Sequence, residues 1–214
     1  MKKVLINVGC GFTVGSSWEN YDASPTVRFE RLPLVGRIYT KNAIRFPDSV
    51  RYGDITKVPL CGIGEADAIF CSHMLEHVSY AAMRDALANI YTMLKSGGVF
   101  RMIVPDLGVR AQNYAERRDR GENDAATILM RDLGMGLEKT SNSLLSRFSA
   151  LLGNSRHHWM YDEQSMRAEL EGVGFRSIRR CRFGDSGVPE IAEVEEESRY
   201  LSEAGEELAF ECIK

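Results

Sequence analysis

Cysteines are few in this sequence, and they are not paired. Five occur among 214 residues, no two of them form a Cys-x-x-Cys motif, and their number is odd. A scattered, odd set argues against a disulfide framework and against a cysteine-based structural zinc site. We therefore expect reduced thiols and a cytoplasmic protein.

Long apolar runs and an excess of basic residues are also missing. No segment approaches the roughly 20 apolar residues that a membrane-spanning helix needs. The N-terminal segment MKKVLINVGCGF is interrupted by Gly-Cys-Gly, and no small-residue cleavage site of a signal peptide follows it. The net charge of −3 suggests no broad basic surface for nucleic acid. We expect neither a stable membrane anchor nor a nucleic-acid partner.

Strand-like apolar runs that alternate with helical patterns are present. This alternation is typical of a mostly parallel sheet covered on both faces, and a hydrophobic content of 44% is enough to fill its core. We predict one domain over 1–214 with a doubly wound, Rossmann-like α/β fold. The predicted strands span 3–8, 18–22, 50–54, 67–72, 98–104, 175–183 and 207–214.

Two amphipathic helices have clear sequence signals. The first has an apolar stripe at helical spacing and should end at Gly97-Gly98. The second should begin after Asp162 as N-cap and end at Gly174. The stripes consist of Met83, Leu87, Ile90, Tyr91 and Leu94 in the first helix and of Met166, Leu170 and Val173 in the second.

The stretch 121–156 interrupts the alternation of strands and helices. It follows a polar helix predicted over 106–120, and its second half has apolar residues at helical spacing. We predict a helical cap insertion over one edge of the sheet, whose apolar stripe makes cap or dimer contacts. This stripe is Leu144, Phe148, Leu151 and Leu152.

Candidate ligand-binding residues end the first two predicted strands. Gly9 and Gly11 allow the backbone after the first strand to turn tightly and to approach a ligand closely. Asp22 ends the second strand, where its carboxylate can accept hydrogen bonds from ribose hydroxyls. A plain turn or an N-cap explains each of these residues equally well.

The next two predicted strands end in the same way. Asp54 can take the exocyclic amine of adenine, with the backbone N–H of Ile55 reaching a ring nitrogen. Ser72 and His73 end the fourth strand. The carboxyl ends of neighbouring parallel strands meet in one crevice, where such folds bind ligands. The set of four strand ends therefore indicates a binding site more strongly than any single residue does.

Five segments, read in order, resemble the motifs of class I S-adenosylmethionine-dependent methyltransferases. They are LINVGCGF, YDASP, GDITKVPL, FCSHMLEHV and LKSGGVFRMIVPDL. The LEH and VPD segments look like the small-molecule branch of this family. The segment HHWMYDEQSMRAELEGVGFRSIRRCRFGDS resembles a subgroup found with bacterial polysaccharide and glycosyl-transfer genes. The resemblance covers nearly the whole chain and is weakest over 121–156.

The resemblance implies a seven-stranded sheet with its last strand antiparallel, and S-adenosyl-L-methionine as cofactor. Gly9 and Gly11 would cradle the methionine portion, Asp22 the ribose, and Asp54 the adenine. The acceptor would be a small molecule, with a sugar or a sugar nucleotide as one alternative, and a homodimer is a further expectation. The cofactor-binding residues would be Asn7, Gly9, Cys10, Gly11, Asp22, Ala23, Asp54, Ile55, Ser72 and His73.

Three features depart from the family pattern. Asn7 stands where an acidic residue is common, although its amide oxygen can still accept a hydrogen bond from the cofactor's ammonium. Thr13 replaces the third glycine of the usual loop. Asp22 follows Gly11 by only eleven residues, which leaves little room for a helix, and Trp18 lies in this short connection.

His73 is our candidate general base, because the free pKa of histidine lies near neutrality, although a structural role fits it equally well. His77 lies four residues on and could share a helix face with it, but two histidines make a poor metal site, so we expect no metal. Glu76 and His77 are expected to stabilise the start of the next helix. Three later residues are candidates to face the acceptor: His157, His158 and Tyr161.

Two other functions compete with methyl transfer. Gly9, Gly11 and Gly15 superficially fit the dinucleotide loop of an NAD(P)-dependent oxidoreductase, but Asp22 follows too closely and no helix fits between. The other alternative is a catalytically inactive cofactor-binding module that partners a glycosyl-transfer enzyme.

Two clusters of charged residues near the C-terminus can be explained by exposure to solvent. The arginines of strand 175–183 are expected on a solvated edge of the sheet or, alternatively, in contact with a phosphate or sugar-nucleotide acceptor. The glutamates from Glu190 to Glu207 are expected in a solvated loop or helix.

Overall fold

The computed structural model describes residues 2–33, 45–136 and 156–214. Its centre is a seven-stranded sheet in the order β3-β2-β1-β4-β5-β9-β6. The first five strands of this order pair in parallel, and β9 runs antiparallel to both its neighbours, β5 and β6. This arrangement confirms the predicted Rossmann-like fold. The strands are β1 Leu5–Val8, β2 Glu19–Asp22, β3 Val50–Tyr52, β4 Ala66–Ser72, β5 Leu94–Val104, β6 Arg176–Arg180 and β9 Leu208–Ile213.

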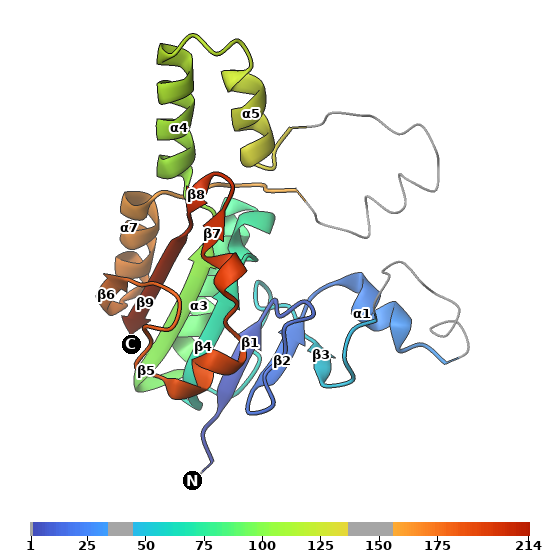
Figure 1. The fold of residues 1–214 in the computed structure, drawn as a ribbon. Helices are drawn as coiled ribbons and strands as arrows, with labels where there is room; N and C mark the ends of the chain where they lie inside the picture. Colours follow the sequence, from blue (N-terminus) through green and yellow to red (C-terminus); the bar gives the residue numbers. More distant parts are fainter. Residues whose placement is uncertain (1, 34–44, 137–155) are drawn as a thin grey trace.

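Helices and short turns cover the two faces of this sheet (Figure 1). Helices α3 and α7 pack on one face, and the 3₁₀ helices η2 and η3 of the C-terminal segment cover the other. The described helices are α1 Pro25–Glu30, η1 Leu75–His77, α3 Tyr80–Met93, α4 Leu107–Asp119, α5 Ala125–Asp132, α7 Glu163–Val173, η2 Pro189–Glu193 and η3 Glu197–Arg199. A small hairpin joins β7 Leu201–Ser202 to β8 Gly205–Glu206.

Helix α3 confirms the predicted apolar stripe but ends earlier than predicted. Ser79 caps its N-terminus, and Met83, Leu87 and Ile90 are fully buried against the sheet. The prediction that Gly97-Gly98 ends the helix is wrong, because the chain becomes extended at Leu94 and enters β5 without a loop. Leu94 already pairs with Ala66 of β4, and the register shifts before the next pair.

Helix α7 has the ends that the sequence predicts. Asp162 accepts a hydrogen bond from Ser165 N at 2.8 Å, and the Ser165 hydroxyl oxygen accepts one from Asp162 N at 3.1 Å, which forms a capping box. Gly174 ends the helix in the left-handed conformation, with φ of 116°. Met166 and Leu170 lie fully buried in the core beneath it.

Helices α4 and α5 form an antiparallel pair that stands away from the sheet (Figure 1). Helix α4 confirms the polar helix predicted over 106–120. Buried Arg110 ties its base to the body of the protein through two hydrogen bonds to Glu207, at 2.8 and 2.9 Å. Helix α5 is the described part of the predicted cap insertion; its stripe Leu144, Phe148, Leu151 and Leu152 lies outside the described residues.

Most glutamates between Glu190 and Glu207 are exposed in a segment of loops and short 3₁₀ helices, as predicted, but Glu195 and Glu207 are buried. Arg101 of β5 is fully buried, and its guanidinium pairs with Glu195, Glu211 and Asp185 while also bonding to Tyr200. The prediction fails for Glu195 because its partner lies about a hundred residues earlier in the chain, and composition alone does not reveal it. This ion cluster fixes the segment that covers the second face of the sheet.

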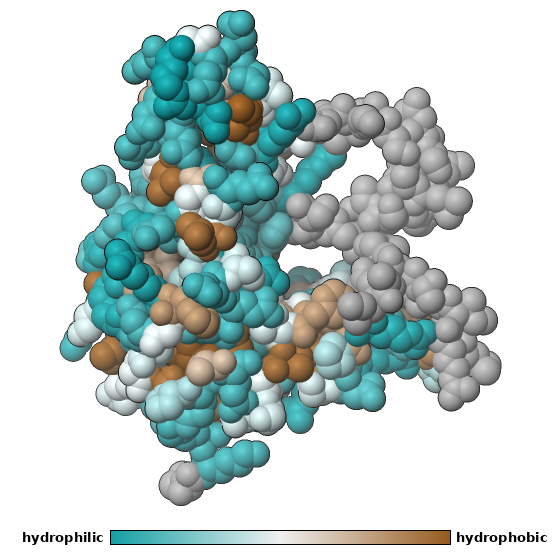
Figure 2. All heavy atoms as spheres, in the orientation of Figure 1, coloured by the Kyte–Doolittle hydropathy of each residue, from teal (hydrophilic) through white to brown (hydrophobic). Residues whose placement is uncertain are grey.

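The described surface is mostly hydrophilic. Figure 2 shows polar side chains over most of the α4–α5 pair and apolar ones in small separate groups. Strand β6 lies at the edge of the sheet, as predicted for the arginine-rich strand, although Arg179 and Arg180 make ion pairs with Glu211 and Asp106. Within the described ranges, no helix has the length and apolar content to cross a bilayer.

Candidate active site

Two adjoining cavities lie where β1, β2, β3 and β4 end. The larger, of about 380 Å³, is lined by both Asp22 and Asp54, and the smaller, of about 210 Å³, by Ser72. Gly9, Asp22 and His73 line both, so the two cavities form one continuous site. Each of the ten residues expected to bind the cofactor lines at least one cavity. The shared geometry follows from parallel strands ending at one edge of the sheet.

Gly9 sits where the chain turns after β1, and this position needs glycine for two reasons. Its φ is +64°, a conformation that costs other L-residues roughly 1–2 kcal/mol. A Cβ atom there would lie only 2.7 Å from Met74 Cγ. The close packing brings the loop after β1 against the loop after β4, which narrows the site.

We predict that Gly9→Ala destabilises the fold by about 2 kcal/mol or more, because strain and overlap with Met74 add together. Gly64→Ala is the matched control, since Gly64 has φ of +66° but nothing within 4 Å of the new Cβ. Chemical denaturation measures both. Equal losses in the two variants would show that the contact with Met74 does not matter.

Asn20 holds the short connection between β1 and β2 in place of a helix, and the sequence analysis missed it. Its side chain donates to the carbonyls of Gly15 and Trp18 at 3.0 Å and accepts from Gly15 N at 3.2 Å. Asn7 donates to Thr13 O at 2.9 Å and to Asn20 at 3.2 Å. Both amides are buried, so these bonds shape the loop that forms the floor of the smaller cavity.

Asp22 joins the first two strand ends. One carboxylate oxygen accepts from Gly11 N at 3.0 Å, and the other accepts from Ser24 N at 2.7 Å. Burial raises the pKa of Asp22, although these two backbone bonds act in the opposite direction. Because a carboxylate has about four acceptor sites, two hydroxyls can still bind it.

Asp54 forms the turn after β3, where its carbonyl accepts from Lys57 N at 3.1 Å. One oxygen accepts from Thr56 Oγ1 at 2.6 Å, and the other pairs with Lys57 at 2.8 Å. Burial alone would raise the pKa of Asp54, but the bonds from Lys57 and Thr56 outweigh it and lower the value overall. The carboxylate therefore remains an acceptor at the wall of the larger cavity.

Ser72 and Cys10 line the smaller cavity with different chemistry. The Ser72 hydroxyl is buried and makes no hydrogen bond with any described residue. A buried hydroxyl without a partner is unfavourable, so this atom fits a site that a polar ligand completes. Burial raises the pKa of Cys10 to about 12, which keeps its thiol protonated at neutral pH.

His73 is held tightly between two elements. Its backbone has φ of +50°, and its Nε2 lies 2.9 Å from the carbonyl oxygen of Arg199 in η3. Its Nδ1 lies 3.4 Å from Glu76 Oε1. Burial acts to lower the pKa of His73, but the neighbouring Glu76 carboxylate outweighs this and raises it overall. Strained backbone of this kind often marks functional positions.

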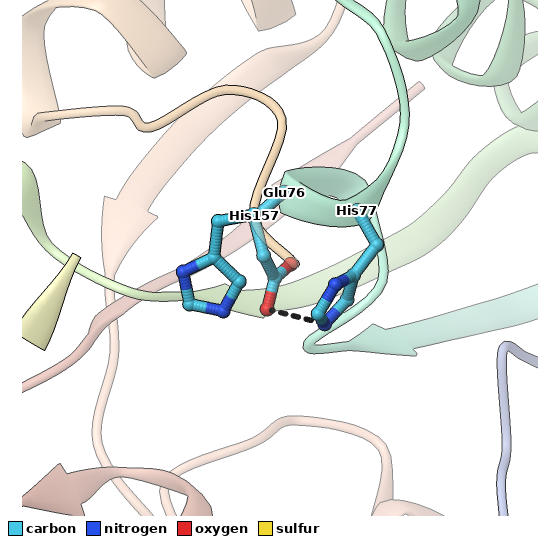
Figure 3. A group of neighbouring side chains, drawn as sticks. All are labelled: Glu76, His77 and His157. Carbon is cyan, nitrogen blue, oxygen red and sulfur yellow. Dashed lines mark ion pairs between the residues drawn. The ribbon is translucent and has the colours of Figure 1, made fainter. Parts of the chain in front are cut away.

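Glu76 and His77 do not stabilise the start of α3, contrary to the sequence-based expectation, because Ser79 caps that helix. They lie instead in η1, and Glu76 is fully buried. The expectation that His73 and His77 share a helix face is also wrong, since His73 precedes this short helix. Figure 3 shows Glu76 beside His77 and His157; the two histidine rings pack edge to face, with their centroids 4.9 Å apart.

The three residues proposed to face the acceptor have separate surroundings. His157 packs on His77 and contacts Leu133 O through Nδ1 at 2.7 Å, and burial lowers its pKa. The side chain of His158 is exposed. Tyr161 is buried, with a hydroxyl that no described residue hydrogen-bonds. Of these three side chains, the structure places that of His157 against His77 of η1, while His158 contacts η1 through its backbone N–H, which donates to Glu76 O at 2.7 Å.

The C-terminal segment closes the smaller cavity, which no sequence motif indicated. Val194 and Arg199 line it, and Glu196 accepts a hydrogen bond from Thr13 Oγ1 at 2.7 Å. Thr13 is the residue that replaces the third glycine of the family loop. The hydrogen bond ties the loop after β1 to the segment that Arg101 anchors, so the site depends on that anchor.

Comparisons with known proteins place this chain in a family. Residues 9–179 match the family model described as "Methyltransferase domain". The chain therefore belongs to the methyltransferases, and the fold and family together make it a class I S-adenosylmethionine-dependent methyltransferase, an enzyme that uses S-adenosylmethionine as cofactor. No curated protein matches this chain at a significant level.

Several solved structures resemble the fold at low sequence identity. A methyltransferase from Mesorhizobium loti has 12% identity and a TM-score of 0.49, over 100% of this chain and 91% of that one. One from Archaeoglobus fulgidus has 13% identity and a TM-score of 0.47, over 99% and 86%. A Burkholderia thailandensis 1,6-didemethyltoxoflavin-N1-methyltransferase, solved with its substrate and S-adenosylhomocysteine, has 15% and 0.46, over 99% and 70%.

Proposed function

We propose that the ten residues at the ends of β1 to β4 hold S-adenosylmethionine, and that the acceptor is a small molecule entering beside His73 and His77. One observation carries this assignment: Asp22 and Asp54, from separate strands, line the same cavity. That cavity continues past Gly9 and His73 into the smaller one. An extended ligand with a nucleoside at one end fits such a pair of cavities.

Each part of the cofactor has matching groups in this arrangement. In the larger cavity, Asp22 accepts hydrogen bonds from the ribose hydroxyls, and Asp54 with Ile55 takes the adenine. Ala23 borders the ribose in the larger cavity, and in the smaller one the backbone at Gly9, Cys10 and Gly11 surrounds the methionine portion. Asn7 accepts from the ammonium group, and the partnerless Ser72 hydroxyl gains a partner.

Bound S-adenosylmethionine supplies an electrophilic methyl group. The protein's task is to orient an acceptor nucleophile and to exclude water, which can supply about 7–11 kcal/mol of the barrier. We propose His73 as general base when the acceptor is a hydroxyl. To take a proton, its Nδ1 has to give up the contact with Glu76.

The acceptor class that we propose is a sugar or a sugar nucleotide, as in the polysaccharide-associated subgroup. Support comes from the segment HHWMYD, which resembles that subgroup and lies against η1 through His158 N and Glu76 O at 2.7 Å. Trp159 of this segment and Tyr80 are partly exposed, with ring centroids 5.0 Å apart and ring planes inclined by 34°, and offer an apolar aromatic surface. We treat 1–214 as one domain with 121–156 as its cap; the homodimer and the cytoplasmic location stay predictions.

An acceptor panel tests this function. Release of S-adenosylhomocysteine is measured with sugars, sugar nucleotides, phenols and amines at equal concentration. We expect turnover with members of the first two classes. Turnover only with amines or phenols contradicts the sugar proposal, and cofactor binding without turnover on any acceptor supports the inactive module instead.

Ser72→Ala separates the role of this hydroxyl in binding from any role in folding. We expect unchanged or slightly higher stability without ligand, because an unsatisfied buried group is removed. Affinity for S-adenosylhomocysteine should fall roughly two- to tenfold, the loss of one ordinary hydrogen bond. Calorimetric titration and thermal melting give the two values. Unchanged affinity would remove Ser72 from the site.

A further inference from the structure

Glu76 is a buried carboxylate whose charge is poorly compensated. The residue is fully buried, and neither oxygen accepts a hydrogen bond from any described residue. Its nearest nitrogens are His73 Nδ1 at 3.4 Å and His77 Nε2 at 3.8 Å, both longer than the roughly 2.7–2.9 Å of a charge-assisted bond. A buried charge without close partners is strongly unfavourable, so the site is suited to a cation.

Besides His73, the imidazoles of His77 and His157 lie at this carboxylate in a defined orientation. His77 Nδ1 lies 3.0 Å from Arg156 O, and His157 Nδ1 lies 2.7 Å from Leu133 O. A carbonyl oxygen only accepts, so each Nδ1 carries a proton, and the lone pair of each neutral ring is on Nε2. Figure 3 shows both rings beside the Glu76 carboxylate.

Backbone carbonyls that hold Nδ1 in this way are typical partners of metal-binding histidines, because they fix both the tautomer and the ring orientation. One donor atom each from Glu76, His77 and His157 lies within 4.8 Å of the others. Ligand atoms around zinc lie about 2 Å from the ion, so small rotations of three side chains would close the site.

We propose that Glu76, His77 and His157 bind one divalent transition-metal ion, with zinc as the best fit. Two imidazoles and one carboxylate match the three protein ligands of catalytic zinc sites, which leave a position open. Imidazole ligands favour first-row transition metals over magnesium and calcium. The expectation of no metal rested on two histidines in one motif, whereas the structure adds a buried carboxylate and a histidine from beyond the cap.

The position of the ion suggests its use. His77 lines the cavity that Asp22 and Asp54 also line, so the ion would lie at its wall, near His73. We infer that the open position takes an oxygen of the acceptor and fixes its orientation toward the cofactor site. This use rests on the proposed function, whereas metal binding itself does not.

Equilibrium dialysis tests the site. The full-length protein is stripped with a chelator and dialysed against micromolar zinc chloride, and bound zinc is measured by mass spectrometry. We expect one equivalent in the wild type and at least tenfold weaker binding in Glu76→Gln, His77→Ala and His157→Ala. His158→Ala is the matched control, because its exposed side chain lies next to His157 in sequence, and it should bind as the wild type does.

Cobalt absorption spectra of the wild type give a second test that does not depend on whether the variants fold. We expect visible bands of a cobalt ion bound by nitrogen and oxygen. Absence of binding at micromolar metal, full affinity in His157→Ala, or an intense thiolate–cobalt band from a cysteine would each overturn the proposal. S-adenosylhomocysteine is titrated in parallel: if it binds while zinc does not, only the metal site fails, and the reverse result rejects only the cofactor assignment.

Discussion

Replacing Asp22 by alanine should weaken binding of S-adenosylhomocysteine at least about tenfold, because hydrogen bonds to a charged group contribute about 1.5–3 kcal/mol each. The variant also loses the bond to Gly11 N, which loosens the loop that forms the methionine side of the site. Isothermal titration measures the affinity, and thermal melting separates the effect on the fold. Wild-type affinity in Asp22→Ala would refute the ribose assignment.

Two controls define what Asp22 contributes. Asp22→Asn keeps an oxygen that can accept from Gly11 N, so it should lose less affinity than the alanine variant. Glu19→Ala changes an exposed acid at the other end of the same strand and should leave affinity unchanged. Affinity should also fall as pH is lowered through the pKa of Asp22, which burial raises, because only the carboxylate form has its full set of acceptors.

Replacing Arg101 by methionine should destabilise the fold by about 3–5 kcal/mol, the usual cost of leaving buried partners of an ion pair uncompensated. Glu195 would then be a buried acid that lacks its cation, whereas Glu211 would keep only its pair with Arg179. The exposed pair Arg51–Glu19 is the control, and Arg51→Ala should change stability by less than about 0.5 kcal/mol. Urea denaturation measures both variants.

The same variant connects stability to the site. The ion cluster anchors the segment that places Arg199 over the smaller cavity and bonds Glu196 to Thr13. We therefore expect Arg101→Met to weaken cofactor binding even at temperatures where the protein stays folded. A loss of stability below about 1 kcal/mol would mean that the cluster is dispensable, since surface pairs contribute no more than that.

The sheet and the meeting of the strand ends at common cavities could be predicted because both follow from local patterns. A buried parallel strand is a continuous apolar run, and the residue after it lies at a common edge of the sheet by geometry alone. Asp22 and Asp54 therefore came together from two independent local signals. The N-cap Asp162 and the stop at Gly174 were predictable for the same reason, since a helix end depends on few neighbouring residues.

The remaining features depend on partners that are distant in sequence. No residue near Glu195 in sequence indicates that it forms an ion pair with buried Arg101. Likewise, nothing in the LEH segment indicates that His157 packs on His77. Asn20 is a polar residue in a short strand, and its four hydrogen bonds become visible only when the loop is folded around it. The early end of α3 depends on the pairing of Leu94 with β4, which outweighs the local signal of the two glycines.

A crystal structure of the protein with S-adenosylhomocysteine is the most direct test of the cofactor site. We predict that the ribose hydroxyls bind the Asp22 carboxylate, that adenine lies beside Asp54 and Ile55, and that the methionine portion reaches Ser72. The ligand lying elsewhere, or bound with its ribose away from Asp22, would contradict the assignment.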